Sequence, residues 1–109
     1  MGNLVEVAKV NEVPVGKMKG VTVEGKEILV VNFEGKYYAI GKICNHQRGD
    51  LSKGKLEGKT VTCPKHGSQF DVTTGVSVRG PRVAFIRGKT GNVPYYEVKV
   101  EGDSIKVNV

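Results

Sequence analysis

Short hydrophobic segments separated by glycine-containing turns run along most of this 109-residue chain. The strongest is residues 27–33, a run of mainly branched apolar side chains, and Glu34-Gly35 separates it from a second apolar segment at residues 36–40. Two such segments joined by a glycine-containing pair predict a tight β-hairpin.

Further segments with a strand pattern follow the same rule. They are residues 4–10, 60–62, 95–100 and 104–109. The turn Glu101-Gly102-Asp103 lies between the last two, which predicts a second hairpin, and Thr73-Thr74-Gly75 predicts another turn. Because no segment keeps a helical period over ten residues, we expect one all-β domain over residues 1–109, a sandwich or a small barrel. The pattern predicts no element for residues 83–93.

All the cysteines and histidines of the chain lie in one stretch. Cys44 and His46 are separated by one residue, sixteen residues follow, and Cys63 and His66 are then separated by two. Thiolate and imidazole are the ligands that proteins use for iron–sulfur centres and zinc. Four such residues in two closely spaced pairs therefore indicate a metal centre rather than scattered core residues.

Two other uses of these side chains compete with an iron–sulfur centre. A disulfide between Cys44 and Cys63 would leave both histidines unexplained, and the N-terminus carries no secretion signal. A tetrahedral zinc site with two cysteines and two histidines is the principal competitor. Structural zinc sites, however, more often combine C-x₂₋₄-C with H-x₃₋₅-H than two mixed pairs.

The paired Cys-x-His and Cys-x-x-His motif resembles that of the Rieske iron–sulfur proteins. The resemblance implies one [2Fe–2S] cluster, with Cys44 and Cys63 on one iron and His46 and His66 on the other. Two ferric ions, two sulfides and two thiolates sum to zero charge, so such a cluster accepts an electron more readily than one with four thiolates.

The resemblance also implies an architecture. We expect a Rieske-like antiparallel β-sandwich with a small subdomain of cluster-binding loops. The base would comprise residues 1–41 and 83–109, and the cluster-binding part would comprise about residues 42–82.

Further residues match family positions around the cluster. Ser68 corresponds to a serine that donates a hydrogen bond to a bridging sulfide, and Phe70 corresponds to a tyrosine that here lacks its hydroxyl. Gln47 follows the first histidine, and Gly80-Pro81 matches a short loop that covers the cluster. The resemblance is therefore greater to soluble Rieske-type ferredoxins, including archaeal and bacterial ones, than to subunits of respiratory complexes.

Charge is distributed unevenly along the chain, whose net charge is +6. Residues 42–94 hold ten basic and three acidic residues, whereas residues 1–41 are neutral overall and residues 95–109 carry −1. Because the excess falls on the cluster-binding part, we expect a docking face for redox partners with acidic surfaces. The candidate contacts lie in or beside the ligand loops and are Arg48, Lys65, Arg79 and Arg82.

These features together predict an electron carrier rather than an enzyme. We expect a soluble, cytoplasmic protein with no membrane anchor and no nucleic-acid partner, serving a reductase and a terminal oxidoreductase. The alternatives are a Rieske small subunit or redox-sensing module of a larger oxidoreductase and, third, a zinc-stabilised binding module.

Overall fold

The computed structural model describes residues 3–43, 49–64, 67–79, 82–83, 86–87 and 91–109. Within these ranges it has the strands β1 (Leu4–Lys9), β2 (Met18–Val23), β3 (Lys26–Phe33), β4 (Lys36–Gly41), β5 (Lys55–Glu57), β6 (Thr60–Thr62), β7 (Gln69–Asp71), β8 (Ser77–Arg79), β9 (Arg82–Val83), β10 (Ile86–Arg87), β11 (Tyr95–Tyr96), β12 (Val98–Glu101) and β13 (Ser104–Asn108). Two single turns of 3₁₀ helix, η1 (Val10–Glu12) and η2 (Leu51–Lys53), complete the described elements.

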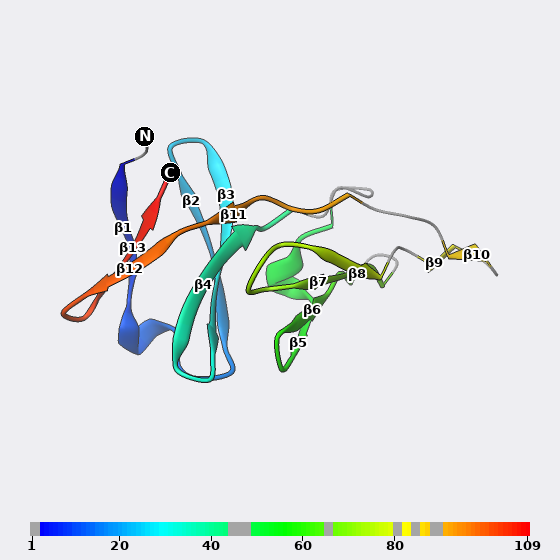
Figure 1. The fold of residues 1–109 in the computed structure, drawn as a ribbon, viewed down its shortest axis with the longest axis horizontal. Coiled ribbons are helices and arrows are strands. Elements are labelled where there is room, and N and C mark those ends of the chain that lie inside the picture. The colour runs from blue at the N-terminus through cyan, green and yellow to red at the C-terminus, as the bar shows by residue number, and fades with distance from the viewer. Residues whose placement is uncertain (1–2, 44–48, 65–66, 80–81, 84–85, 88–90) are drawn as a thin grey trace.

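The strands form four antiparallel sheets that follow one another along the long axis of the molecule (Figure 1). A three-stranded sheet has the order β1-β13-β12, and a four-stranded sheet has the order β11-β4-β3-β2. A second four-stranded sheet, β5-β6-β7-β8, lies on the other side of β3 and β4, and the hairpin β9-β10 extends beyond it. The expected all-β class is confirmed.

The hairpin predicted from residues 27–40 is present as β3 and β4. Its two connecting residues, Glu34 and Gly35, have φ values of 55° and 89°. Positive φ at both positions is the type I′ geometry, whose twist matches that of the flanking strands. The same geometry recurs at Glu24 and Gly25 between β2 and β3, with φ values of 49° and 78°. Strand β2 was not predicted from the sequence.

Several predicted strand boundaries differ from the observed ones, by one residue at β3 (Lys26–Phe33) and β4 (Lys36–Gly41). The segment predicted at residues 95–100 divides between two sheets, because β11 pairs with β4 whereas β12 pairs with β13. Residues 4–10 end as a strand at Lys9, and Val10 instead begins η1. The last strand ends at Asn108. The hairpin that closes the chain is otherwise as predicted, with Glu101 opposite Ser104.

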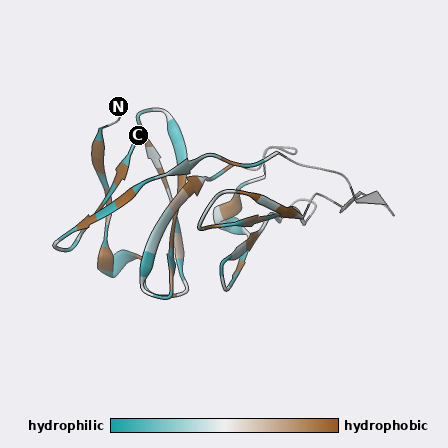
Figure 2. Cartoon of the chain, in the orientation of Figure 1, coloured by the Kyte–Doolittle hydropathy of each residue, from teal (hydrophilic) through white to brown (hydrophobic). Residues whose placement is uncertain are grey.

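Strand β3 supplies both hydrophobic cores. Ile28 and Val30 belong to the core between β3 and the β1-β13-β12 sheet, together with Ile105 and Val107. The alternate residues Leu29 and Val31 belong to the core on the opposite face. Since successive side chains of a strand point to opposite faces, a continuous apolar run is buried on both sides. Figure 2 shows this hydrophobic strand between hydrophilic turns.

The second core joins β3 and β4 to the β5-β6-β7-β8 sheet. Its buried members are Leu29, Val31, Ile40, Leu51, Val61, Cys63, Phe70, Val72 and Val93. They come from six separate stretches of the chain, and Cys63 is among them. One of the predicted metal ligands is therefore built into the core that connects the two sheets.

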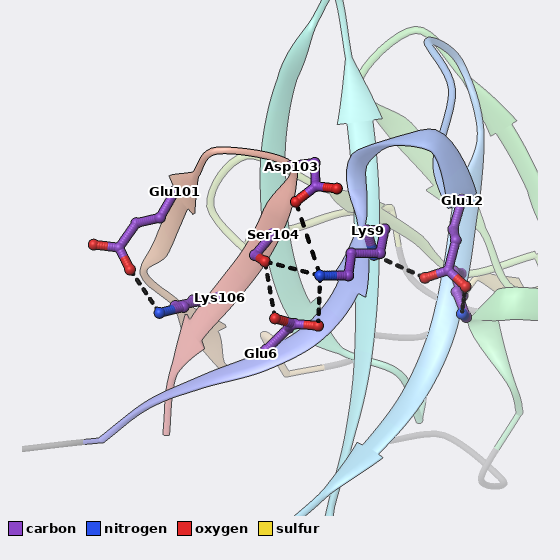
Figure 3. Close-up of polar contacts among 8 residues, drawn as sticks. Glu6, Lys9, Glu12, Glu101, Asp103, Ser104 and Lys106 are labelled. Atoms are coloured by element: carbon purple, nitrogen blue, oxygen red, sulfur yellow. Dashed lines mark hydrogen bonds and ion pairs between the residues drawn. The ribbon is translucent and has the colours of Figure 1, made fainter.

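Polar contacts join β1 to β13 at the end of the molecule that lies away from the β5-β6-β7-β8 sheet (Figure 3). Lys9 Nζ lies 3.3 Å from Glu6 Oε2 and donates to Ser104 Oγ at 3.2 Å, and Ser104 Oγ donates to Glu6 Oε1 at 2.8 Å. The hydrogen bond from Ser104, then the neighbouring lysine, lowers the pKa of Glu6 below its usual value. This network joins β1 to β13, on the side of the molecule away from the sheet β5-β6-β7-β8 (Figure 1).

Candidate metal centre

The first predicted ligand loop, residues 44–49, lies between two residues that are paired through their backbones. Ile43 and Asp50 form an antiparallel bridge on either side of it. The next residue, Leu51, donates its N–H to the carbonyl oxygen of Lys42 at 2.8 Å. Both ends of the loop are thus held together by backbone contacts.

Asp50 organises the chain as it leaves this loop. Its Oδ1 accepts hydrogen bonds from the backbone N–H of Ser52 at 2.9 Å and from Ser52 Oγ at 2.6 Å, which caps η2. Lys42 Nζ lies 3.7 Å from Asp50 Oδ2. Partial burial raises the pKa of Asp50, but the bonds from Ser52 and the charge of Lys42 outweigh it and keep that pKa below its usual value. The carboxylate is therefore ionised at neutral pH.

The second predicted ligand loop, residues 63–68, connects the paired strands β6 and β7. Cys63 donates its N–H to the carbonyl oxygen of Ser68 at 2.7 Å, and Gly67 donates to the carbonyl oxygen of Cys63 at 3.2 Å. Gly67 has φ +80°, a conformation that side chains other than glycine rarely adopt. The side chain of Cys63 is buried, with 2% of the residue exposed.

A glycine brings the two loops together. A Cβ at Gly54, which ends η2 beyond the first loop, would overlap the carbonyl oxygen of Thr62, the residue before Cys63. The adjoining residue Lys55 pairs with Thr62 across β5 and β6. Leu51 and Cys63 also share one core. The chain leaving the first loop therefore packs directly against the strand that enters the second.

Two buried residues lie just after the second ligand pair. Ser68 is 1% exposed, and its Oγ has no hydrogen-bond partner among the described residues. Burying an unpaired hydroxyl is costly, so its position beside the ligand loop suits an acceptor supplied by a bound cofactor. Phe70 is fully buried in the core that contains Cys63. The residues present thus fit a cluster with acceptor sulfurs.

The predicted turn at residues 73–75 supports this sheet from the far side. Asp71 Oδ1 accepts from the N–H of Thr73 at 2.8 Å and from Thr73 Oγ1 at 2.6 Å, while Gly75 donates to the carbonyl oxygen of Asp71 at 2.7 Å. Gly75 has φ +79°, and a Cβ there would overlap the carbonyl oxygen of Val93. Partial burial raises the pKa of Asp71, but the Thr73 bonds and Lys59 bring it below its usual value.

The predicted site residues divide into two groups. Those outside the described residues are Cys44, His46, Gln47, Arg48, Lys65, His66, Gly80 and Pro81. Of the others, the structure brings Cys63, Ser68 and Phe70 together around one loop and one core. It places Arg79 at the end of β8 and Arg82 at the start of β9. In the described part of the chain no three His, Cys, Asp or Glu side chains gather into a further metal site.

Neither Gly54 nor Asp50 was predicted from the sequence, and Gly75 was predicted only as part of a turn, without its close approach to Val93. Each acts through contacts with residues distant in the chain or through a local turn. The Asp-x-Ser and Asp-x-Thr spacings at Asp50 and Asp71 were an available signal, because such side chains bond the backbone two residues on.

The family of the chain is established by comparison with known proteins. Residues 3–104 match the model of the Rieske [2Fe–2S] domain, and the chain belongs to this family. It is 36% identical over 105 residues to the ferredoxin component of the naphthalene 1,2-dioxygenase system of Pseudomonas aeruginosa, covering 96% of this chain and 94% of that protein.

Solved structures show the same relationship. The ferredoxin of carbazole 1,9a-dioxygenase from Nocardioides aromaticivorans IC177 superposes with a TM-score of 0.82 at 29% identity, over 96% of each chain. A chain in a complex of reduced oxygenase and oxidised ferredoxin of carbazole 1,9a-dioxygenase superposes with a TM-score of 0.81 at 26% identity, over 96% of this chain and 92% of that one.

The cofactor and the class of activity follow from these findings. This chain is a Rieske ferredoxin that carries electrons on a [2Fe–2S] cluster, as the motif predicted, and the zinc interpretation is set aside. A helix with the length and hydropathy of a membrane span does not occur in the part of the chain that the structure describes.

Proposed function

We propose that Cys44 and Cys63 hold one iron of the cluster and that His46 and His66 hold the other. The burial of Cys63 at the closed base of its loop supports this assignment for the inner iron. The bound cluster supplies one-electron transfer. The protein's part is to keep the thiolates dry and to bring both loops to one end of the β5-β6-β7-β8 sheet.

Residues around the loops would set how readily the electron is accepted. The buried hydroxyl of Ser68 can donate a hydrogen bond, which favours the more negatively charged, reduced state. Phe70 excludes water without offering a donor. Gln47 and Gly80-Pro81 would cover the remaining sides of the centre. The base is then residues 1–41 and 83–109, and the cluster-binding part is about residues 42–82.

The physiological role that we infer is that of the ferredoxin in a multicomponent aromatic-ring dioxygenase system. The observation that carries it is the match over 94% of the length of a naphthalene 1,2-dioxygenase ferredoxin component. In that role the chain accepts electrons from a reductase and delivers them to an oxygenase in the cytoplasm.

Charge would guide both encounters. Arg79 and Arg82 flank the Gly80-Pro81 loop, while Arg48 and Lys65 lie within the ligand loops. With the net +7 of residues 42–94, they support docking on acidic partner surfaces. Such encounters are brief and depend on salt.

Reconstitution tests this role. The purified protein replaces the native ferredoxin in a mixture of the reductase and oxygenase components of the naphthalene 1,2-dioxygenase system, with naphthalene and reduced nicotinamide cofactor. We expect ring hydroxylation that depends on this protein. The matched control is Cys63→Ser, which lacks one thiolate and should support no turnover. Hydroxylation that stays at the ferredoxin-free level with the intact protein would contradict the role.

A further inference from the structure

One lysine is held between two carboxylates at the start of the first predicted ligand loop. Strand β4 ends at Gly41, and the next residue is Lys42 (Figure 1). Lys42 Nζ lies 3.5 Å from Glu27 Oε1 and 3.7 Å from Asp50 Oδ2, and only 15% of the lysine side chain is exposed. Glu27 belongs to β3, whereas Asp50 follows the loop. The ammonium group therefore connects the base of the molecule to the entry and the exit of this loop.

Both the backbone and the stem of this lysine have defined positions. Lys42 donates its N–H to the carbonyl oxygen of Glu27 at 3.0 Å, and its own carbonyl oxygen accepts from the N–H of Leu51 at 2.8 Å. A Cβ at Gly20 on β2 would lie 2.7 Å from Lys42 Cδ and 3.2 Å from Ser52 Cβ. The stem thus packs over a position of β2 that carries no side chain, which places the charge at the end of the stem.

The two neighbours of the ammonium group are negatively charged at neutral pH. Thr22 Oγ1 donates to Glu27 Oε1, and this bond, together with the charge of Lys42, outweighs desolvation and keeps the pKa of Glu27 below its usual value. Asp50 is likewise ionised. One ammonium group and two carboxylates have a net charge of −1, and loss of Lys42 alone would leave −2.

These charges lie close to the first cysteine of the motif. Lys42 precedes Cys44 by two residues, and this length of chain spans at most about 7 Å between Cα atoms. Charges that are partly buried are screened by salt much less than exposed ones. Because reduction adds one negative charge to the cluster, a positive charge nearby favours the reduced state and a negative charge favours the oxidised state.

We propose that Lys42 sets the reduction potential of the cluster by offsetting the two carboxylates beside the first ligand loop. This inference rests on the proposed ligation by Cys44 and adds a charge to the hydrogen bond of Ser68. The low exposure of Lys42 separates it from the basic residues proposed for docking, since a partner would reach little of its side chain. The competing interpretation is an ion pair that only stabilises the fold, and the two interpretations differ in what they predict for Glu27.

The test removes the two charges of one ion pair in turn. Lys42→Met and Glu27→Gln both break the contact between Nζ and Oε1, but they change the local charge in opposite directions. Voltammetry measures the reduction potential, and electron paramagnetic resonance of the reduced protein checks that the cluster is assembled. The matched controls are Lys106→Met and Glu101→Gln, the same substitutions in an ion pair of the β12–β13 hairpin, where Nζ and Oε1 lie 2.6 Å apart.

We expect Lys42→Met to lower the equilibrium constant for reduction by at least about threefold, equivalent to about 28 mV at 59 mV per tenfold for a one-electron couple. Glu27→Gln should raise it by about twofold, less than the lysine effect because this side chain is 42% exposed. Each control should change it by less than about 1.5-fold. Shifts of both variants in the same direction, or shifts no larger than those of the controls, would overturn the proposal.

A second variant keeps the proposal testable if Lys42→Met does not retain its cluster. Glu27→Gln then decides alone, because a higher potential supports the proposal and a lower or unchanged one overturns it. The charge of Glu27 is removed there without loss of the lysine.

The same measurements separate this proposal from the proposed function. An intact protein without a [2Fe–2S] signal, or a Cys44→Ser variant with an unaltered spectrum and potential, would overturn both the ligation and this inference. A normal cluster signal with shifts of the wrong sign would overturn this inference alone. Opposite shifts of the expected sign, in a protein that fails to support naphthalene hydroxylation, would support this inference and overturn only the proposed physiological role.

Discussion

The two ends of this molecule are stabilised in different ways. The base is built from β1 to β4 and β11 to β13, in which β3 is eight residues long and pairs along its length with two neighbours. The cluster-binding sheet, β5 to β8, has strands of only three residues each. A long strand that pairs with two neighbours and is buried on both faces supplies many ladder bonds and much buried apolar surface, whereas three-residue strands supply few ladder bonds.

The cluster-binding sheet compensates for its short strands with specific contacts. Two aspartates, Asp50 and Asp71, each fix a turn through the residue two positions on. Two glycines, Gly54 and Gly75, allow backbone to approach backbone where any side chain would collide. The base is therefore stabilised by many strand-pairing and core contacts. The cluster-binding sheet depends on a few specific contacts and on the cofactor.

Loss of the cofactor should show the difference between the two ends of the molecule most clearly. In Cys63→Ser we expect residues 55–79 to lose amide protection by at least tenfold, because opening of that sheet no longer costs the free energy of cluster binding. Residues 26–41 and 98–108 should change by less than about twofold. Hydrogen exchange followed by mass spectrometry measures both, and uniform loss of protection along the chain would show that the ends are not independent.

Substitution of one glycine sharpens the comparison. Gly75→Ala should lower the free energy of unfolding by about 2–4 kcal/mol, since it combines an unfavourable positive φ with a backbone collision at Val93. Gly58→Ala is the matched control, because Gly58 also has positive φ but no neighbour near its missing Cβ. It should cost about 1–2 kcal/mol. Equal costs in urea titrations would mean that the contact between Gly75 and Val93 contributes nothing.

Charge at Asp71 should have a smaller, pH-dependent effect. The folded-state pKa of Asp71 is depressed, so its contribution is fully present above the unfolded pKa of about 4 and is lost as pH falls through the folded value. Asp71→Asn should therefore cost about 1 kcal/mol at pH 7 and progressively less below pH 4.

Asp103→Asn is the control for this effect. The side chain of Asp103 is 77% exposed, and its Oδ1 lies 3.8 Å from Lys9 Nζ. Asp103→Asn should therefore change the free energy of unfolding by less than about 0.5 kcal/mol. If Asp71→Asn lowered the free energy of unfolding by the same amount down to pH 3, the ionised carboxylate of Asp71 would not be the source of the stabilisation.

The hydroxyl of Ser68 should have the smallest effect, on the reduction potential. Ser68→Ala should lower the midpoint potential by about 20–60 mV, the equivalent of one neutral hydrogen bond for a one-electron couple. Ser77→Ala, on β8 of the same sheet, should leave the potential unchanged. Voltammetry of both variants decides this, and an unshifted potential in Ser68→Ala would show that the buried hydroxyl does not bond the cluster.

The amino-acid sequence predicts the parts of this structure that depend on local patterns. The β3–β4 hairpin followed from its apolar run and Glu34-Gly35. The residue types and spacing of two short motifs indicated a metal centre, and their resemblance to the Rieske motif implied the cofactor. Strand β2 was missed although Glu24-Gly25 repeats the same turn chemistry before Lys26. The approaches of Gly54 to Thr62 and of Gly75 to Val93 join residues far apart in the chain, so no local pattern reveals them.

The ligand assignment remains the central prediction. Electron paramagnetic resonance of the dithionite-reduced protein, combined with ¹⁵N labelling of histidine and pulsed hyperfine detection, tests it most directly. We expect the signal of a reduced [2Fe–2S] cluster with couplings from two histidine nitrogens, of which one disappears in His46→Cys and the other in His66→Cys if a cluster still assembles. A cluster signal without nitrogen coupling would contradict ligation by His46 and His66, and one zinc ion per chain with no signal would contradict the [2Fe–2S] cluster itself.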